Sequence, residues 1–408
     1  MNAQASMPTE TVAAVIVTFN RVDKLPNTIA SVMAQDHPCE KIVIVDNASS
    51  DGTREYLDSL DDPRLVIRHL RENRGGAGGF EYGMALGCEL GVDHVWIMDD
   101  DCYPAPDALR RLVEERREVA EALDEPVPFA CSLVKAIDGA LCEMNNPITT
   151  WDWPRAFLAG RNAMRIVECT FVSVLVPCAV IAEAGLPLAE YFIWYDDKEY
   201  TKRLTAQYAP GIIVMDSIVV HDMGVNAGVN YRQVEKSTLW KFASGARNQA
   251  SYRWNYEGKH SYLDYERRVI EQMREAGVPR EVQAAMRDAL LGGKTFNPRP
   301  KRPAEMRAQL MLDAGRTATA PPADVVPAPA VPFGGVAEGP ASRLRVPARV
   351  KRVFSVLASF RRKSASRQQL QWLSRRTRLL EQELAELQEQ RDRVDALIDE
   401  VSSRIRES

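Results

Sequence analysis

Three consecutive aspartates, Asp99–Asp101, follow the apolar run Trp96–Met98 in this 408-residue chain. A short apolar run of this kind predicts a buried strand, so three carboxylates would meet at its end. Like charges gathered there repel one another unless a cation compensates them. Dense oxygen ligands suit Mg²⁺ or Mn²⁺, which bridge diphosphate oxygens. A solvated loop capped by Asp101 is the alternative, but a cap does not require three carboxylates, so we predict a divalent-cation site.

A second acidic group, Asp196-Asp197, follows the aromatic run Tyr191–Tyr195 and precedes Lys198-Glu199 at the start of a predicted helix. Either aspartate could simply cap this helix, with Glu199 favoured in the first turn by the helix dipole. Aromatic walls could instead partly desolvate one carboxylate and suit it to accept a proton from a hydroxyl. The segment is therefore a candidate for a general base, and both interpretations stay open.

Three further polar features follow or precede predicted elements. Asp46 ends the strand KIVIVD and leads into the turn Asn47–Gly52, where it could close the turn or hold a ribose or base. The glycine-rich turn Asn73–Phe80 lacks the third glycine of G-x-G-x-x-G but would still allow backbone amides to approach a sugar nucleotide. His221 follows another predicted strand and could complete a metal site, although a lone histidine is more often structural.

Alternating strands and helices are expected to position these residues. Apolar runs predict strands at residues 12–17, 41–46, 64–69 and 93–98, and helical patterns cover residues 25–34, 52–60 and 80–90. Further strands are predicted at residues 129–135, 169–177 and 211–220, with a helix beginning near Asp197. The order is that of a doubly wound α/β domain, in which ligands bind at the carboxyl ends of the strands.

Five regions are expected along the chain. Residues 1–230 form the α/β domain, residues 231–315 a helical extension, and residues 316–342 a linker rich in Ala, Pro and Gly. Residues 343–367 carry many basic and no acidic side chains between apolar ones, so they either lie on an anionic membrane surface or form a solvated linker. Residues 368–408 repeat apolar residues in heptads, which predicts a coiled coil and most economically a homo-oligomer.

Composition narrows the possible functions. Lys+Arg 52 against Asp+Glu 56 leaves a net charge of -4, which argues against a general nucleic-acid binder. Seven scattered cysteines without a C-x-x-C pair fit reduced thiols in the cytoplasm. The N-terminus has no secretory pattern, and the longest apolar stretch, residues 171–182, is shorter than the roughly 20 residues that a span needs. We therefore expect a cytoplasmic protein whose membrane contact, if it has any, is peripheral at the inner face.

Taken together, the motifs resemble those of the GT-A glycosyltransferases of family 2. The segments VIVTFNR, VDNASSDGT, NRGGAGGF, MDDD and WYDDKEY occur in the family's order, followed by a strand that ends in histidine, over roughly residues 11–256. Within that family the chain is most similar to the galactofuranosyltransferases of actinobacterial cell-wall synthesis, which share the doubled-glycine loop, the DDD triplet and the acidic aromatic segment. Rhamnosyltransferases of the same family share much of this pattern.

The resemblance implies a role for each matching residue. The residues that would bind the nucleotide-sugar are Thr18, Asn20, Asp46, Asn73, Gly75, Gly76 and Asp100. Asp99, Asp101 and His221 would hold a manganese or magnesium ion, with Asp197 as the base and Asp196 binding a sugar. Phe171 and Trp194 would contact the acceptor, and Arg247-Asn248 resembles an R-N pair common in the family, with no role assigned.

The activity that this resemblance implies is inverting, metal-dependent transfer of galactofuranose from UDP-galactofuranose to a glycan or polyprenyl-linked glycan of the cell wall or cell surface. Polymerising members present a Trp pair to the acceptor where this chain has Phe171-Val172, which favours a priming or side-chain transferase. The alternatives are a rhamnosyltransferase that uses dTDP-rhamnose and a non-catalytic GT-A scaffold assembled through the coiled coil.

Overall fold

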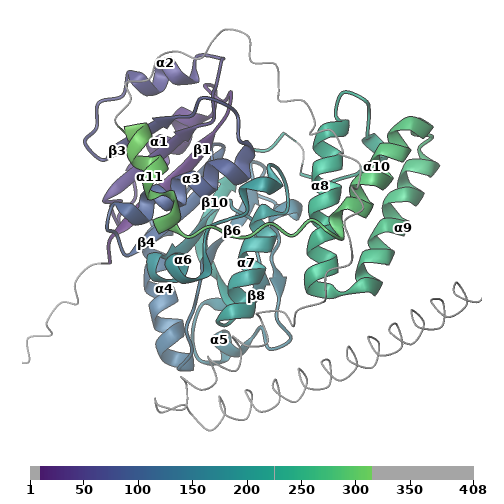
Figure 1. Ribbon diagram of the computed structural model, residues 1–408. Coiled ribbons are helices and arrows are strands. Elements are labelled where there is room, and N and C mark those ends of the chain that lie inside the picture. Colours follow the sequence, from purple (N-terminus) through teal and green to yellow (C-terminus); the bar gives the residue numbers. More distant parts are fainter. Residues whose placement is uncertain (1–9, 225, 315–408) are drawn as a thin grey trace, which may run out of the picture. The chain divides into compact units, whose positions relative to one another are not determined.

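A computed structural model of the chain describes residues 10–224 and 226–314 (Figure 1). The predicted linker, basic segment and coiled coil lie outside the described residues. The described part combines a central mixed sheet, helices on both of its faces and a separate group of helices.

The first half of the sheet is parallel, as the sequence predicts. Its strands are β1 (Val12–Thr18), β2 (Lys41–Asp46), β3 (Leu65–His69) and β4 (His94–Asp99), arranged in the order β3-β2-β1-β4. The connecting helices are α1 (Leu25–Met33), α2 (Thr53–Asp58) and α3 (Gly75–Glu89). The order reverses between β1 and β4, which is the position where ligands bind in doubly wound sheets.

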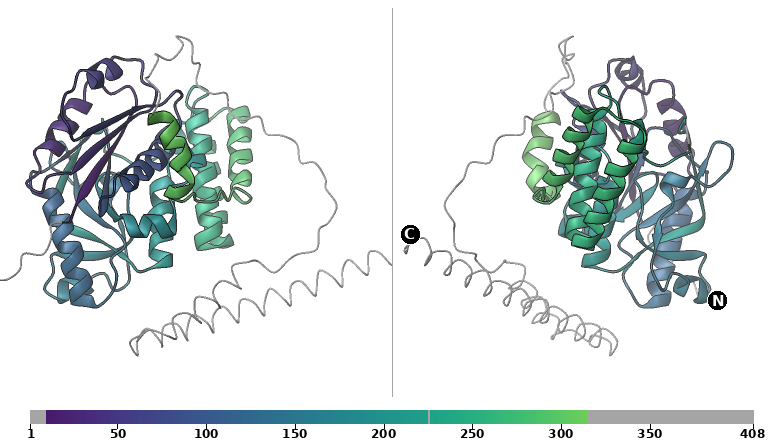
Figure 2. Two further views of the ribbon diagram at one scale, coloured as in Figure 1. Left: turned by 60° about the vertical axis from the view of Figure 1, so that its left-hand side comes forward. Right: turned by 90° about the vertical axis from the view of Figure 1, so that its right-hand side faces the viewer.

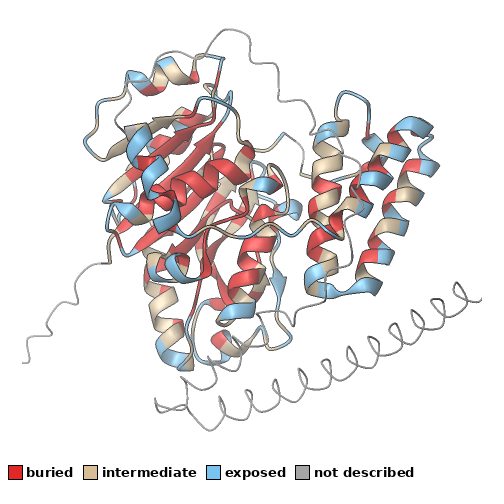
Figure 3. Cartoon of the chain, viewed as in Figure 1, coloured by how far each residue is buried: buried red, intermediate tan, exposed pale blue. Residues whose placement is uncertain are grey.

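Strict alternation along these strands creates two hydrophobic cores, one on each face of the sheet. In β1, Ala14 and Ile16 pack toward α1, α2 and α4 (Ala108–Leu123), whereas Val15 and Val17 pack toward α3. Buried residues therefore fill the strands and the helix faces turned toward them (Figure 3). Burial on both faces explains why the strands are continuous apolar runs in the sequence.

Helix α3 begins at the glycine-rich turn, earlier than the predicted start at Phe80. A Cβ on Gly79 would lie 2.4 Å from Val17 Cγ1, and one on Gly83 would lie 2.5 Å from Val15 Cγ1. These glycines therefore let the helix approach β1 closely, and this packing outweighs their low helix propensity.

The second half of the sheet is mixed, which corrects the simple doubly wound expectation. The strands are β5 (Cys102–Pro104), β6 (Ala130–Ala136), β7 (Ile148–Thr149), β8 (Ala163–Glu168), β9 (Val174–Pro177) and β10 (Gly211–His221). They continue the sheet in the order β4-β9-β6-β10-β8-β7, with β5 paired to β10. β9 is antiparallel to both of its neighbours.

The strand predicted at residues 169–177 is wrong in its first half, because residues 169–173 form a connection between β8 and β9. Polar anchors hold this connection: the Thr201 hydroxyl bonds the Cys169 backbone, and the Ser173 hydroxyl accepts from Trp96 Nε1. The helices of this half are α5 (Arg155–Leu158), α6 (Cys178–Ala184) and α7 (Asp196–Gln207).

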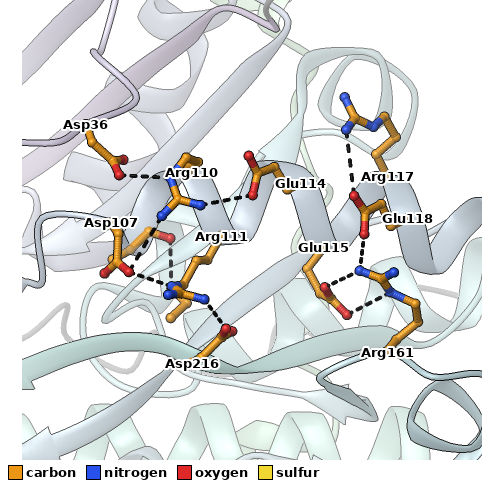
Figure 4. A network of polar contacts seen from close by, with 12 residues as sticks. Asp36, Asp107, Arg110, Arg111, Glu114, Glu115, Arg117, Glu118, Arg161 and Asp216 are labelled. Atoms are coloured by element: carbon orange, nitrogen blue, oxygen red, sulfur yellow. Dashed lines mark hydrogen bonds and ion pairs between the residues drawn. The ribbon is translucent and has the colours of Figure 1, made fainter.

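Ion pairs cover the outer side of α4 (Figure 4). Arg110 binds Asp36, which precedes β2, and Arg161 binds Glu115 and Glu118 from the segment before β8. Arg111 pairs with Asp107 and with Asp216 of β10. These contacts tie α4 to three other parts of the chain, although exposed pairs contribute little stability individually.

The predicted helical extension consists of α8 (Leu239–Tyr252), α9 (Lys259–Glu275), α10 (Arg280–Gly293) and α11 (Pro303–Ala314). The first three lie side by side around their own core (Figure 2). By contrast, α11 packs on α3, where Met306 and Leu310 join the sheet's core. Lys301, just before α11, pairs with the buried Glu81 of α3 at 2.9 Å. The extension thus returns to the α/β domain, which the division at residue 230 does not anticipate.

No helix in the described residues is both long and apolar enough to cross a bilayer.

Candidate active site

The aspartate triplet lies at the topological switch point, beside the end of β1. Val17 pairs with Asp99 across the two strands, and the Phe19 amide donates to Asp100 Oδ2 at 3.2 Å. The Arg21 guanidinium lies 3.6 Å from Asp100 and 3.7 Å from Asp101. A positive side chain from β1's end therefore faces the triplet, whose carboxylates it partly neutralises.

Asp101 and His221 come together from β4's end and the last residue of β10. His221 Nε2 lies 3.2 Å from Asp101 Oδ1, and the second ring nitrogen, Nδ1, lies 2.9 Å from Asn145 Oδ1. Both groups are nearly inaccessible, and Cys102 completes a cluster whose candidate ligand atoms lie within 4.8 Å of one another. Burial raises the pKa of the Cys102 thiol well above its usual range, so the thiol is a poor ligand for a hard cation.

The donors at this cluster fit a divalent cation. The Asn145 contact orients the imidazole and leaves Nε2 directed at the carboxylate, an arrangement typical of metal-binding histidines. Asp101 and His221 are thus brought together as predicted, while Asp99 is not part of the same compact cluster.

Asp99 instead connects the triplet to the second acidic group. Burial raises its pKa well above the usual range, and the charges of Asp101, Asp100, Asp196 and Asp197 raise it further. Carboxylates from the end of β4 and the start of α7 therefore belong to one electrostatic site. A cation placed among them would relieve this repulsion.

Asp196 and Asp197 occupy the first two positions of α7, and the N-cap residue is Tyr195. The alternative in which either aspartate is the N-cap is therefore wrong. Burial, followed by the charge of Asp197, raises the pKa of Asp196 to about 8. Burial raises the pKa of Asp197 to about 6, with the Lys198 charge opposing it, and Asp197 Oδ1 accepts from the Lys198 amide at 2.7 Å. Both carboxyl groups thus ionise less readily than an exposed aspartate, and a raised pKa makes a carboxylate a better proton acceptor.

The residues predicted to bind the nucleotide surround the neighbouring strand ends. Asp46 is buried, and its oxygens accept from the Ser49 amide at 2.9 Å and contact His69 Nδ1 at 2.7 Å. This supports the turn-closing role of Asp46, and its contact with a nucleotide stays a prediction. Asn20, in a left-handed conformation, accepts from the Ser50 amide at 2.7 Å. Burial raises the pKa of Asp100 to about 6, and the nearby Thr18 hydroxyl is buried without a hydrogen-bond partner among the described residues.

Asn47 and Asn73 hold the start of α3. Asn47 Nδ2 donates to Gly75 O at 2.8 Å, its Oδ1 accepts from the Arg74 amide at 2.8 Å, and Asn73 Oδ1 accepts from the Gly75 amide at 2.8 Å. A Cβ on Gly75 would lie 2.0 Å from Phe192 O, whereas one on Gly76 would meet open space. The glycine turn thus contacts the segment before α7, and only Gly75 is required for that contact.

Phe171 does not offer the predicted acceptor surface. Its ring is 3% exposed and packs edge-on against Phe80 and Tyr200 in the core. The aromatic run before α7 had suggested a site wall, but Trp194 packs on α8, against Phe242 and below Lys241. The indole is only partly buried, so its contact with an acceptor stays a prediction.

The tertiary partners of three asparagines at this site are not visible in the sequence. Asn145, which orients His221, and Asn47 lie in loops where an asparagine is ordinarily a turn residue. Asn248, in the R-N pair, donates to the backbone that precedes α7. The resemblance identified that pair, but only tertiary contacts reveal its partners.

The sequence model of the family described as glycosyl transferase family 2 matches residues 13–121, which include β1 to β4 and the aspartate triplet.

Individual relatives carry the same activity class in their names. The galactofuranosyltransferase GlfT1 of Mycolicibacterium smegmatis is 34% identical over 125 residues, covering 31% of this chain and 41% of that protein. GlfT1 of Mycobacterium tuberculosis is 29% identical over 223 residues, covering 53% of this chain and 71% of that protein. An undecaprenyl-phosphate mannosyltransferase of Micrococcus luteus is 32% identical over 108 residues, covering 26% of this chain and 44% of that protein. The chain thus spans less than half of two of these relatives.

Proposed function

We propose that this chain is an inverting glycosyltransferase that uses a nucleotide-sugar donor. Residues 13–121 match the glycosyl transferase family 2 model, and a relative with a galactofuranosyltransferase name supports the same class of activity. The observation that carries the proposal is the electrostatic convergence on Asp99. Burial raises its pKa, and carboxylates at the end of β4 and at the start of α7 raise it further, so cation-binding and proton-accepting groups would share one site.

The donor diphosphate would lie at the end of β4. Asp99, Asp101 and His221 would hold a manganese or magnesium ion there, which would neutralise the charge of the departing nucleoside diphosphate. Arg21 would add a further positive charge beside the phosphates. The nucleotide would extend toward Thr18, Asn20, Asp46 and the loop Asn73–Gly76. Asp100 would hold the end of β1 in place by accepting from the Phe19 amide.

The chemistry would be a single displacement. Asp197 would accept the proton of the acceptor hydroxyl while the hydroxyl oxygen bonds to the anomeric carbon. The bond from that carbon to the diphosphate oxygen would break on the opposite face. Attack opposite the leaving group inverts the anomeric configuration. Asp196, whose pKa burial raises, would hydrogen-bond a sugar hydroxyl.

Two relatives are named galactofuranosyltransferases, which supports galactofuranose as the transferred sugar; the proposed donor is UDP-galactofuranose and the proposed product a cell-wall or surface glycan. A polyprenyl-linked glycan would be the acceptor. Priming or side-chain addition is favoured over polymerisation, because positions 171 and 172 carry Phe and Val rather than indoles and both side chains are buried. A rhamnosyltransferase that uses dTDP-rhamnose is the rival assignment.

A donor panel tests these assignments. Purified full chain with Mn²⁺ would be offered UDP-galactofuranose, UDP-galactopyranose, dTDP-rhamnose and GDP-mannose, and the released nucleoside diphosphate would be measured with and without a polyprenyl-linked acceptor. Turnover of UDP-galactofuranose alone supports the proposal, and turnover of dTDP-rhamnose alone supports the rival. A chain that neither turns over a donor nor binds Mn²⁺ in the presence of UDP would be a scaffold, and the enzymatic proposal would be wrong.

A further inference from the structure

The segment immediately before α7 has an unusual backbone. Phe192, Trp194 and Tyr195 all have positive φ angles, of 63°, 63° and 70°, although none is a glycine. At Phe192 the ψ angle is -58°, and the Ile193 amide donates to Tyr191 O at 2.7 Å. These angles and this bond define a γ-turn of the rare, strained kind. Non-glycine residues rarely adopt such angles, so surrounding contacts must impose the conformation.

Asn248 of α8 supplies those contacts from one side. Its side chain is completely buried, and Nδ2 lies 2.8 Å from Tyr191 O, 3.0 Å from Ile193 O and 3.0 Å from Trp194 O. Two hydrogens thus serve three carbonyl oxygens of the strained segment. The bonds connect α8 to residues that are more than fifty positions away in the sequence.

Arg247 orients this amide. Its Nη2 donates to Asn248 Oδ1 at 2.9 Å and to Glu190 O at 2.9 Å, and its guanidinium lies 3.8 Å from the Phe296 ring centre. Because Oδ1 faces a cation, Nδ2 must face the carbonyls. The two residues of the R-N pair therefore act as one unit.

The glycine turn of α3 contacts the segment from the other side. The Ala77 amide donates to Phe192 O at 3.2 Å, and Gly75 leaves room for that carbonyl. The strained segment is thus held between α3 and α8, and it leads directly into Asp196 and Asp197.

We propose that Asn248 is a positioning residue, which sets the base Asp197 by holding residues 191–195 in their strained conformation. This inference rests on the proposed function, in which Asp197 accepts the acceptor proton. Loss of the amide would let the γ-turn relax and would displace the start of α7. Because small displacements of a reacting group cost up to about 100-fold in rate, the effect belongs in kcat.

Two variants of the full chain test the proposal. Asn248→Asp keeps the side-chain size but turns an oxygen toward the carbonyls, and Arg247→Gln keeps Asn248 while removing the cation that orients it. We expect kcat to fall about 10- to 100-fold in Asn248→Asp and less in Arg247→Gln, with the donor KM within about threefold of wild type. Asn255→Ala, which removes a side-chain amide of the π-helical turn Arg253–Glu257 that is bonded only to Ser251 among the contacts described, should keep wild-type kcat.

Hydrogen exchange separates this proposal from the proposed function. Amides of residues 192–195 should exchange at least tenfold faster in Asn248→Asp, while amides of β1 and β4 stay protected. Should Arg247→Gln fold when Asn248→Asp does not, its exchange and kcat decide the question alone. Unchanged exchange, or faster exchange with unchanged kcat, would overturn the positioning role. If wild type transfers no sugar, the proposed function fails. In that case, slow exchange at residues 192–195 in the variants would also overturn the claim that Asn248 holds this segment in place.

Discussion

Individual carboxyl groups dominate the candidate site. Asp99, Asp196 and Asp197 all have raised pKa values, with burial as the largest cause of each shift. Burying like charges destabilises a fold, so such an arrangement is usually found where the charges have a function. Two consequences of replacing a single carboxyl group can be measured separately: a lower rate of sugar transfer and a higher free energy of unfolding.

Asp197→Asn should reduce transfer about 10²- to 10⁴-fold, because an amide cannot accept the acceptor's proton at neutral pH. Binding of UDP with Mn²⁺, measured by calorimetry, should stay within about twofold of wild type, since the nucleotide-side residues are unchanged. Asp264→Asn, an exposed change on α9, serves as the control. Near-normal transfer by Asp197→Asn would assign the base to another group.

Asp196→Asn should remove a pH-dependent loss of stability. The carboxyl has a pKa of 3.8 when unfolded and about 8 when folded, so between these values the folded protein binds more protons. The free energy of unfolding must therefore fall as pH rises from about 4 to 8. In urea without added divalent cation, the variant should be about 1–3 kcal/mol more stable than wild type at pH 8 and no more stable at pH 4. If the free energies of unfolding of wild type and variant changed in parallel with pH, Asp196 would not ionise in a buried state.

Contacts between elements bring these groups together. Helix α3 reaches β1 through Gly79 and Gly83, and its first turn meets the segment before α7 at Gly75. The element proposed to bind the donor and the segment that leads into the proposed base thus share a backbone contact. Adjacent glycines should therefore differ sharply in their tolerance of substitution.

Gly75→Ala should be damaging and Gly76→Ala mild. Gly75 has a φ of 69°, and its added Cβ would lie 2.0 Å from Phe192 O, so the helix start or the γ-turn must move. We expect at least a tenfold loss of kcat/KM for Gly75→Ala and less than threefold for Gly76→Ala, whose Cβ meets open space. Equal activities in the two variants would contradict the shared contact.

The α/β domain is completed by α11, the last helix of the helical extension. α11 returns to α3 across the sequence, burying Met306 and Leu310 in the sheet's core. Arg307 pairs with Glu89 at 2.8 Å, and Lys301 pairs with Glu81 at 2.9 Å. The last described helix is therefore part of the α/β fold rather than an appendage.

Two truncations test this division. A chain that ends at residue 314 keeps every described contact, and we expect it to unfold at the same urea concentration as the full chain. A chain that ends at residue 295 uncovers the α3 face and should lose about 3–6 kcal/mol, from the burial of two large apolar side chains. Similar stability of the two truncated chains would show that α11 is dispensable.

Comparing the full chain with the form that ends at residue 314 also tests the proposals about residues 315–408. The full chain, but not the form ending at residue 314, should sediment with anionic vesicles and form oligomers, if the basic segment binds membrane and the heptads pair. Equal behaviour of both forms in vesicle sedimentation and analytical ultracentrifugation would remove the membrane and oligomer proposals.

Local features of this protein are readable directly from its amino-acid pattern. Apolar runs such as KIVIVD located the parallel strands, because burial on both faces imposes a continuous apolar pattern. The aspartates at the ends of β4 and at the start of α7 were visible because charge at such positions is unusual. Only the tertiary structure decided which of these residues meet: that β9 runs antiparallel between β4 and β6, that Phe171 is core, and that Asn248 supports the backbone before α7. Local periodicity reports whether a residue is buried, but contacts between distant segments depend on chain topology and packing, which no local pattern encodes.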